Sequence, residues 1–242
     1  MTSIRISERD RRVMVKCAVA RWLTTGQLQR LCFREVSADA ARKSLRRLAE
    51  NGHLVGHREH SMAEAIHGLG PKGKVALAAK GLAAEASREP PRQLEHLIGI
   101  NDIRIAAETS RHRVLYCFAS WELQGLGWAH PVIPDLVAGM QCPERKVFFF
   151  EYDRSTEGLA TLARKFRLYE DGIPGVSLAA LVVVADSDGR LGTLARKIPE
   201  LAGERPVVGC VLSELAASSM EARIFTDLRS GTGRLGLIEL AE

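Results

Sequence analysis

The spacing of apolar residues changes along this chain from a helical period to an alternation of helical and extended segments. In the first 52 residues, apolar side chains recur at steps of three and four, which is the period of one helix face. Ser7 and Thr24 each stand three residues before a polar partner, as helix-capping residues do, and a third helix is predicted from Ser37 to Gly52. The pattern therefore predicts three successive helices at the start of the chain.

Two short extended segments and a fourth helix follow these three helices. Leu54–Arg58 and Ala65–Leu69 predict two strands around a polar tip, and Pro71 stands where the first turn of a helix accepts proline. Three helices, a two-stranded wing and a further helix make the order of a winged helix-turn-helix. The polar, proline-bearing stretch at 87–92 then marks a boundary. We therefore expect an α+β N-terminal winged helix-turn-helix domain over residues 1–89.

Helices and strands alternate in the second half of the chain. The strongest strand signal is the apolar run Val147–Phe150, and no residue from Asp186 onwards contributes a motif. This alternation predicts an α/β domain over residues 90–242, in which helices cover a sheet. The predicted helices span 93–112, 157–169 and 191–201, and the predicted strands span 114–120, 132–138, 146–152, 178–185 and 207–212.

The net charge of +5 is divided unevenly between the two halves. Residues 1–92 carry 18 Lys and Arg against 9 Asp and Glu, a net charge of +9, whereas residues 93–242 carry 16 against 20, a net charge of −4. Such asymmetry indicates a polyanionic partner for the first part. No apolar run is long enough to span a membrane and no secretory signal is recognisable, so we expect a cytoplasmic protein that does not bind membranes.

The third predicted helix has an apolar stripe and a basic face. Ala41, Leu45 and Leu48 recur at four- and three-residue steps and should pack inward. Four cationic residues lie away from this stripe, in two pairs four residues apart, and a DNA phosphate backbone would turn their mutual repulsion into attraction. A solvated charged face is the alternative. The candidate DNA-binding residues are Arg42, Lys43, Arg46 and Arg47 on this helix and Arg58 on the wing.

Acidic residues gather near two predicted strands of the second domain. Glu151 and Asp153 are two residues apart on one strand, so their side chains share a face. If Asp135 lies on a neighbouring strand, three carboxylates meet there, and such oxygens are the ligands that Mg²⁺ prefers. Asp135 and Glu151 are the candidate metal ligands, and a bound metal ion would activate water for phosphodiester cleavage. A salt-bridged strand end is the alternative.

This acidic pattern resembles the restriction-endonuclease-like fold of the PD-(D/E)xK superfamily. The resemblance implies a catalytic set of Asp135, Glu151, Asp153 and Lys165, in which Asp153 occupies the position of the superfamily's lysine. That departure puts catalysis in doubt, and Lys165 or Arg154 is the candidate substitute. The resemblance also implies a further acid from the preceding helix, for which Glu95 and Glu108 are the candidates.

Several segments together resemble the replication-relaxation family of bacterial plasmids and mobile elements. The resemblance covers most of residues 10–185, and its most specific part is the segment 151–157. It implies a winged helix and a role in plasmid replication or in relaxing DNA at a transfer origin. The segments that carry it are His96 with Asn101, Asp102 and Arg104, Trp121-Glu122, Pro134-Asp135, the run from Glu151 to Glu157, Lys165 and Tyr169.

Three functions are compatible with these observations. The first is a DNA-binding accessory protein in plasmid or mobile-element replication or DNA relaxation, with replication or relaxosome proteins as partners. The second is a metal-dependent DNA endonuclease using Mg²⁺, and the third is a winged-helix transcriptional regulator that dimerises or binds a protein through its second domain. Double-stranded DNA is the expected partner in all three, and a homodimer is compatible with each.

Overall fold

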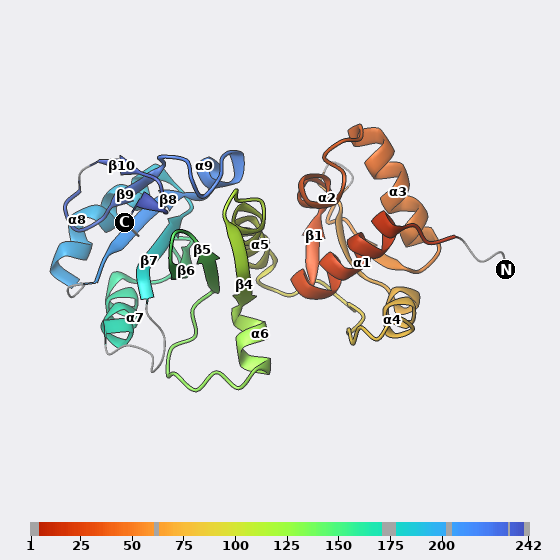
Figure 1. Ribbon diagram of the computed structural model, residues 1–242, viewed down its shortest axis with the longest axis horizontal. Helices are drawn as coiled ribbons and strands as arrows, with labels where there is room; N and C mark the ends of the chain where they lie inside the picture. The colour runs from red at the N-terminus through yellow and green to blue at the C-terminus, as the bar shows by residue number, and fades with distance from the viewer. Residues whose placement is uncertain (1–4, 61–62, 171–177, 202–204, 232, 240–242) are drawn as a thin grey trace. The chain divides into compact units, whose positions relative to one another are not determined.

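The chain forms two compact units, residues 1–101 and 102–242, each with its own sheet (Figure 1). The computed structural model describes residues 5–60, 63–170, 178–201, 205–231 and 233–239. Helices and strands are mixed in both units, which confirms the mixed α and β fold class. Within the described residues, no helix is long and apolar enough to cross a membrane.

The first unit contains the helices and the hairpin that the sequence predicts. Ser7 and Thr24 each cap a helix by accepting a hydrogen bond from the amide three residues later, at 3.1 Å in both cases. The strands form an antiparallel sheet in the order β1-β3-β2. The elements are α1 (Glu8–Ala20), β1 (Trp22–Thr24), α2 (Thr25–Cys32), α3 (Ala38–Glu50), β2 (Leu54–His57), β3 (Ile66–Leu69) and α4 (Pro71–Ala78).

The apolar stripe of α3 holds this helix against the core of the first unit. Ala41, Leu45 and Leu48 are each at most 1% exposed, as their spacing predicts. The stripe fixes the rotation of α3 about its axis, because turning the helix would expose these side chains at a cost of roughly 25 cal/mol per Å² of apolar surface. The opposite face of α3, which carries Arg42, Lys43 and Arg46, is therefore held outward.

The first half of α5 (Leu94–Glu108) belongs to the first unit. Asn101 is fully buried, and its Nδ2 donates to the carbonyl oxygens of Ala20 at 3.1 Å and Trp22 at 2.8 Å. These two carbonyls flank Arg21, whose φ of +65° turns the chain sharply from α1 into β1. The expected boundary stretch at 87–92 is irregular, but contacts with the first unit continue as far as Asn101.

A seven-stranded mixed sheet organises the second unit. Its order is β10-β9-β8-β7-β6-β5-β4, with β6, β7 and β8 parallel and the remaining neighbours antiparallel. The strands are β4 (Arg113–Ala119), β5 (Leu136–Gln141), β6 (Arg145–Asp153), β7 (Leu178–Ala185), β8 (Val207–Val211), β9 (Phe225–Asp227) and β10 (Arg234–Leu235), and the further helices are α6 (Ser120–Gly125), α7 (Leu159–Glu170), α8 (Asp188–Leu201) and α9 (Leu212–Ala217).

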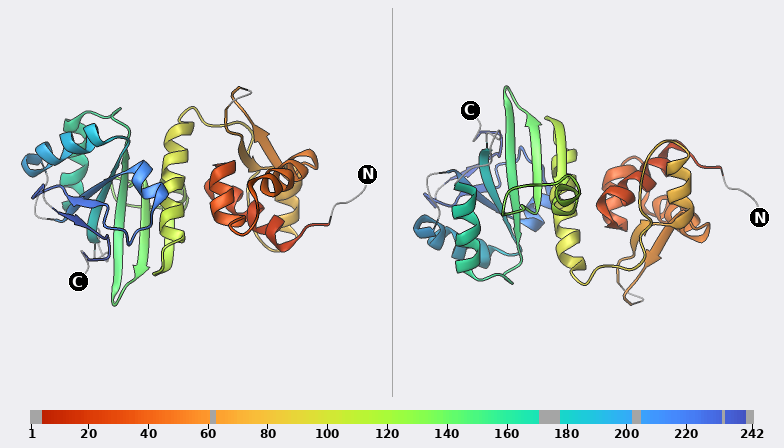
Figure 2. Two further views of the ribbon diagram at one scale, coloured as in Figure 1. Left: turned by 90° about the horizontal axis from the view of Figure 1, so that it is seen from above. Right: turned by 90° about the horizontal axis from the view of Figure 1, so that it is seen from below.

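The phenylalanine run of β6 lies in the middle of this sheet and contributes to both of its faces. Phe149 packs in a cluster with Phe166 and Tyr169 of α7 and with Leu194 of α8, so these helices cover its face of the sheet. Figure 2 shows α7 and α8 together on one side of the sheet. Since side chains alternate along a strand, Glu151 points to the same helix-covered face as Phe149.

Some boundaries differ from the sequence prediction for identifiable reasons. The strand predicted at 132–138 begins only at Leu136, so Asp135 immediately precedes it. The helix predicted at 93–112 ends at Glu108. The short elements β1, α6, α9, β9 and β10 were not predicted, because segments of two to six residues are too short to display a period.

The two hydrogen bonds of Asn101 give the first prediction. We expect Asn101→Ala to lower the free energy of unfolding of the first unit by about 2 kcal/mol, because it leaves two buried carbonyls without their donor. The matched control is Asn51→Ala, which removes one hydrogen bond from a half-buried amide to the Arg47 carbonyl and should cost less than about 1 kcal/mol. Amide hydrogen exchange of α1 and β1 measures both effects, and equal effects would contradict the role assigned to Asn101.

Candidate functional site

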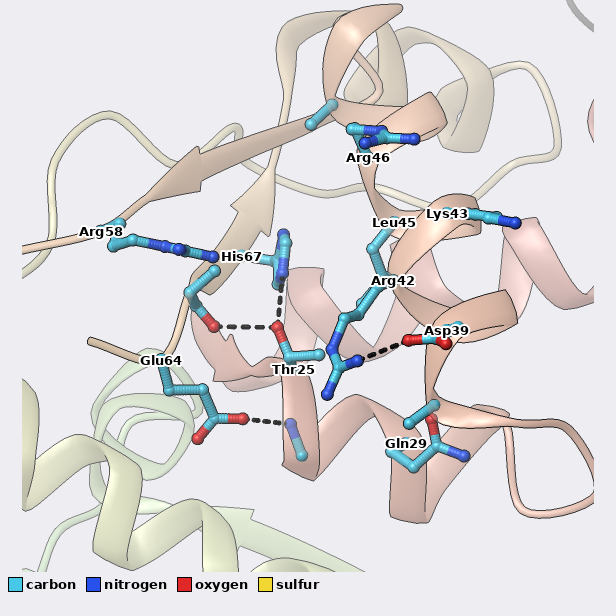
Figure 3. A pocket seen from close by; sticks show the side chains of 14 residues that line it. Thr25, Gln29, Asp39, Arg42, Lys43, Leu45, Arg46, Arg58, Glu64 and His67 are labelled. Atoms are coloured by element: carbon cyan, nitrogen blue, oxygen red, sulfur yellow. Dashed lines mark hydrogen bonds and ion pairs between the residues drawn. The ribbon is translucent and has the colours of Figure 1, made fainter. Parts of the chain in front are cut away.

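A pocket of about 750 Å³ lies between α2, α3 and the β2–β3 hairpin of the first unit. Figure 3 shows that its cationic side chains come from two elements on different sides of it. Two carboxylates, Asp39 and Glu64, also line it. The cations are Arg42, Lys43 and Arg46 from α3 and Arg58, which follows β2. The structure thus brings together four of the five predicted DNA-binding residues, and we call this region the basic pocket.

Hydrogen bonds between α2 and the hairpin form the floor of the basic pocket. The Thr25 hydroxyl donates to the Ala65 carbonyl at 3.2 Å, so it accepts from Nε2 of His67 at 3.1 Å. Burial and the nearby charge of Arg58 lower the pKa of His67 to about 4. The ring is therefore neutral at neutral pH, and it holds the hairpin to α2 without adding to the positive charge of the pocket.

Glu64 makes a second link between the hairpin and α2. Its Oε1 accepts a hydrogen bond of 2.5 Å from the amide of Gly26, in the first turn of α2. The N-terminal amides of a helix are favourable positions for an anion. The tip of the predicted wing, at 59–64, includes residues 61 and 62, which lie outside the described residues.

The cations of α3 differ in how they are paired. Nη1 of Arg42 donates to Asp39 Oδ1 at 2.7 Å, whereas Nε of Arg46 lies 3.8 Å from Glu50, beyond hydrogen-bonding distance. Both pairs are exposed to solvent, so neither adds much to stability. What distinguishes Arg42 is that a short hydrogen bond orients its guanidinium group.

Arg47, the fifth predicted DNA-binding residue, lies elsewhere. Its Nη2 donates to Asp10 Oδ1 at 2.5 Å, and Asp10 is buried in α1. Burial would raise the pKa of Asp10, but the hydrogen bonds from Arg47 and Ser7 outweigh it and the pKa is lowered. The Arg47–Asp10 pair thus ties α3 to α1, and Arg47 does not line the basic pocket.

A second cluster of polar residues surrounds Glu151 in the second unit. Glu151 is 2% exposed, and its two oxygens accept from Tyr169 and from Lys165, whose Nζ is 3.1 Å away; both partners belong to α7. Asp135 lies close enough to raise the pKa of Glu151, and its Oδ2 accepts from the amide of Tyr152 at 2.8 Å. Asp135, Glu151 and Lys165 are thus brought together.

Asp153 faces a different set of partners. Its Oδ1 accepts from the amide of Ser155 at 2.9 Å, and its Oδ2 accepts from Nε of Arg190, on α8, at 2.9 Å. Among the residues that the structure describes, no group of three or more His, Cys, Asp or Glu side chains is arranged to hold a metal ion. Both oxygens of Glu151 and of Asp153 are hydrogen-bonded to neighbouring protein groups.

The two further candidate acids, Glu95 and Glu108, lie on α5 on either side of the division between the units. Glu95 belongs to the first unit, and the charge of Glu108 acts on Arg104 of the same helix. Arg104 is 4% exposed and pairs with Glu122 of α6. Arg154, the other candidate for the missing lysine, follows β6, while Lys165 provides the ammonium group beside Glu151.

Several residues of the two sites were not among the site residues predicted from the sequence, although Tyr169 was among those that carry the family resemblance. Tyr169 stands four residues after Lys165, so helical spacing places both on one face of α7 and gives a signal that was present. No spacing in the sequence predicted the contact of Arg190 with Asp153, because the two residues are 37 positions apart and lie on different elements. His67 and Glu64 enter the basic pocket only through the pairing of the hairpin with α2.

Comparison with known proteins places the chain in a family. The replication-relaxation family model matches residues 18–176, about two thirds of the chain, and the chain belongs to this family. The matched segment includes the basic pocket and the cluster from Asp135 to Tyr169, whereas Arg190 lies beyond it. No curated protein and no solved structure gave a match.

The environment of Glu151 predicts a pH dependence of stability. Burial and the nearby Asp135 raise the pKa of Glu151 to about 8, against the opposing effects of Lys165 and Tyr169. Since an unfolded carboxyl group ionises near pH 4.5 while the folded one stays protonated, stability should fall as the pH rises from about 5 to 8. Glu151→Gln should remove this slope in urea unfolding measurements.

The control for this experiment is Glu157→Gln. Glu157 also pairs with Lys165, at 3.0 Å, but it is exposed to solvent. This variant should therefore keep the pH dependence of the unmodified chain. A slope that survives in Glu151→Gln, or disappears in both variants, would contradict the assignment to Glu151.

Proposed function

We propose that the first unit is a winged-helix module that binds double-stranded DNA through the basic pocket, in the replication or relaxation of a plasmid or mobile element. In this proposal α3 is the recognition helix and the β2–β3 hairpin is the wing. The observation that carries the proposal is the joint placement of three cations on the outward face of α3 and of Arg58 at the hairpin, around one pocket.

Electrostatics supports a polyanion as the partner of this surface. The first 92 residues carry a net charge of +9, and four cations meet at the pocket against two carboxylates. A surface with an excess of cations attracts a polyanion, and binding to such a surface releases the counterions condensed on DNA phosphates. Family membership favours replication or relaxation over a transcriptional regulator.

A second candidate function is metal-dependent DNA cleavage by a nuclease-like second unit. The observation in its favour is Lys165, which places an ammonium group 3.1 Å from Glu151 although Asp153 occupies the expected lysine position. Against it stands the pairing of the carboxylates with Tyr169, Lys165 and Arg190. These contacts support a structural role, in which the cluster joins β6 to α7 and α8.

The DNA-binding proposal predicts a specific effect of the α3 cations. The double variant Arg42→Ala, Arg46→Ala should weaken binding of the full chain to duplex DNA by at least about tenfold at low salt. The slope of log affinity against log salt concentration should decrease by at least about one, because fewer counterions are released. Fluorescence anisotropy with a labelled duplex, repeated over a range of salt concentrations, measures both quantities.

A matched double variant separates the pocket from net charge. Lys74→Ala, Lys80→Ala removes the same charge from α4 and the turn after it, outside the basic pocket. We expect it to change affinity by less than about threefold. Equal losses of affinity in the two double variants would show that affinity for DNA depends only on the net charge of the protein. The basic pocket would then not be the binding surface.

The cleavage alternative has its own test. Supercoiled plasmid DNA is incubated with the full chain and Mg²⁺ or Mn²⁺, and nicked and linear products are separated on a gel. From the paired carboxylates we expect binding without cleavage. Metal-dependent nicking that is lost in both Asp135→Ala and Lys165→Met would instead establish the second unit as a nuclease.

A further inference from the structure

One arginine of the basic pocket is held by a short ion pair on its own helix. Arg42 lies in the second turn of α3 and lines the pocket beside Asp39, with which it forms a hydrogen bond of 2.7 Å. Figure 3 shows this bond at the wall of the pocket. Among the described residues, it is the shortest ion pair made by a cation of α3 that lines the pocket.

The position of Asp39 on α3 stabilises its negative charge. Asp39 lies in the first turn of α3, after Ser37, which caps the helix by accepting a hydrogen bond from the Ala40 amide at 3.3 Å. A negative charge in the first turn is stabilised by the helix dipole. Arg42 is three residues further on, so the two side chains are neighbours on one helix surface. The helix therefore favours the geometry in which Asp39 restrains Arg42.

The hydrogen-bonding capacity of Arg42 is largely unused by this pair. A guanidinium group has five N–H donors in a fixed plane, and Asp39 takes one of them in the described contact. The remaining donors include the parallel pair that binds O6 and N7 of guanine in the major groove. Removal of water on DNA binding would strengthen the contact with Asp39, which is weak in solvent.

We infer that Arg42 reads a guanine in the duplex and that Asp39 is the positioning residue that sets this specificity. The inference rests on the proposed function, and it adds the recognised partner: duplex DNA with a G·C pair facing the second turn of α3. Arg46 is not oriented in the same way, because Glu50 lies 3.8 Å from its Nε and does not line the pocket. Arg46 and Lys43 therefore supply charge to the phosphates.

The test compares sequence preference among variants of the full chain. A pool of randomised duplexes is selected on the unmodified chain, and the selected duplex is then compared with one in which a single G·C pair is changed to A·T. The unmodified chain should prefer the G·C duplex by about tenfold in affinity at one position. Arg42→Lys keeps the charge but loses the planar fork, so the preference should fall towards one.

Asp39→Asn and the control Glu50→Gln distinguish positioning from charge. Each variant removes one exposed carboxylate from α3, so each should raise affinity for both duplexes to a similar extent. Asp39→Asn should in addition lose most of the G·C preference at the position affected by Arg42→Lys, whereas Glu50→Gln should retain it. Thermal melts monitored by circular dichroism verify that each variant is folded.

The possible failures are distinguishable from one another. A G·C preference that is equal in the unmodified chain and in Asp39→Asn would overturn the positioning role. Binding without any preference for sequence would overturn the guanine contact and leave the proposed DNA-binding function intact. A full chain that binds no duplex at low salt would remove the proposed function itself, and the inference with it.

Discussion

The burial of the apolar stripe of α3 determines what the first unit can present to a partner. Ala41, Leu45 and Leu48 are at most 1% exposed, and any rotation of the helix would bring them into water. The Arg47–Asp10 pair adds a second constraint, because it joins the same helix to α1. With α3 fixed in this way, its cations Arg42, Lys43 and Arg46 line the basic pocket.

The second unit is organised around a polar cluster placed at the end of an apolar strand. β6 carries three phenylalanines to the core and ends in Glu151 and Asp153, which are both buried. Each carboxyl group is bonded to a basic residue on a different helix, Lys165 on α7 and Arg190 on α8. These contacts fix the arrangement of the elements they join, because breaking one leaves a buried polar or charged group without its partner. These residues carry the nuclease-like pattern expected from the sequence, and their contacts join β6 to α7 and α8.

The sequence predicted the elements whose period is long enough to be visible. The capped helices, the basic face of α3, the hairpin and the central strands of the second unit were all visible in the local pattern of apolar, capping and charged residues. The role of Arg47 could not be predicted, because its partner Asp10 lies 37 residues earlier in the chain and only folding brings the two together. Lys165 and Arg154 were both candidates to replace the superfamily's lysine, and the spacing in the sequence did not decide between them. The structure places Lys165 beside Glu151. Tertiary pairing, and not local propensity, decides such contacts.

The central claim is that the basic pocket is the surface that meets DNA. Amide hydrogen exchange of the full chain, with and without a saturating duplex at low salt, tests it most directly. The account predicts added protection in α3, in the first turn of α2 and in the β2–β3 hairpin. Protection confined to the second unit, or none in α3 while the duplex is bound, would contradict it.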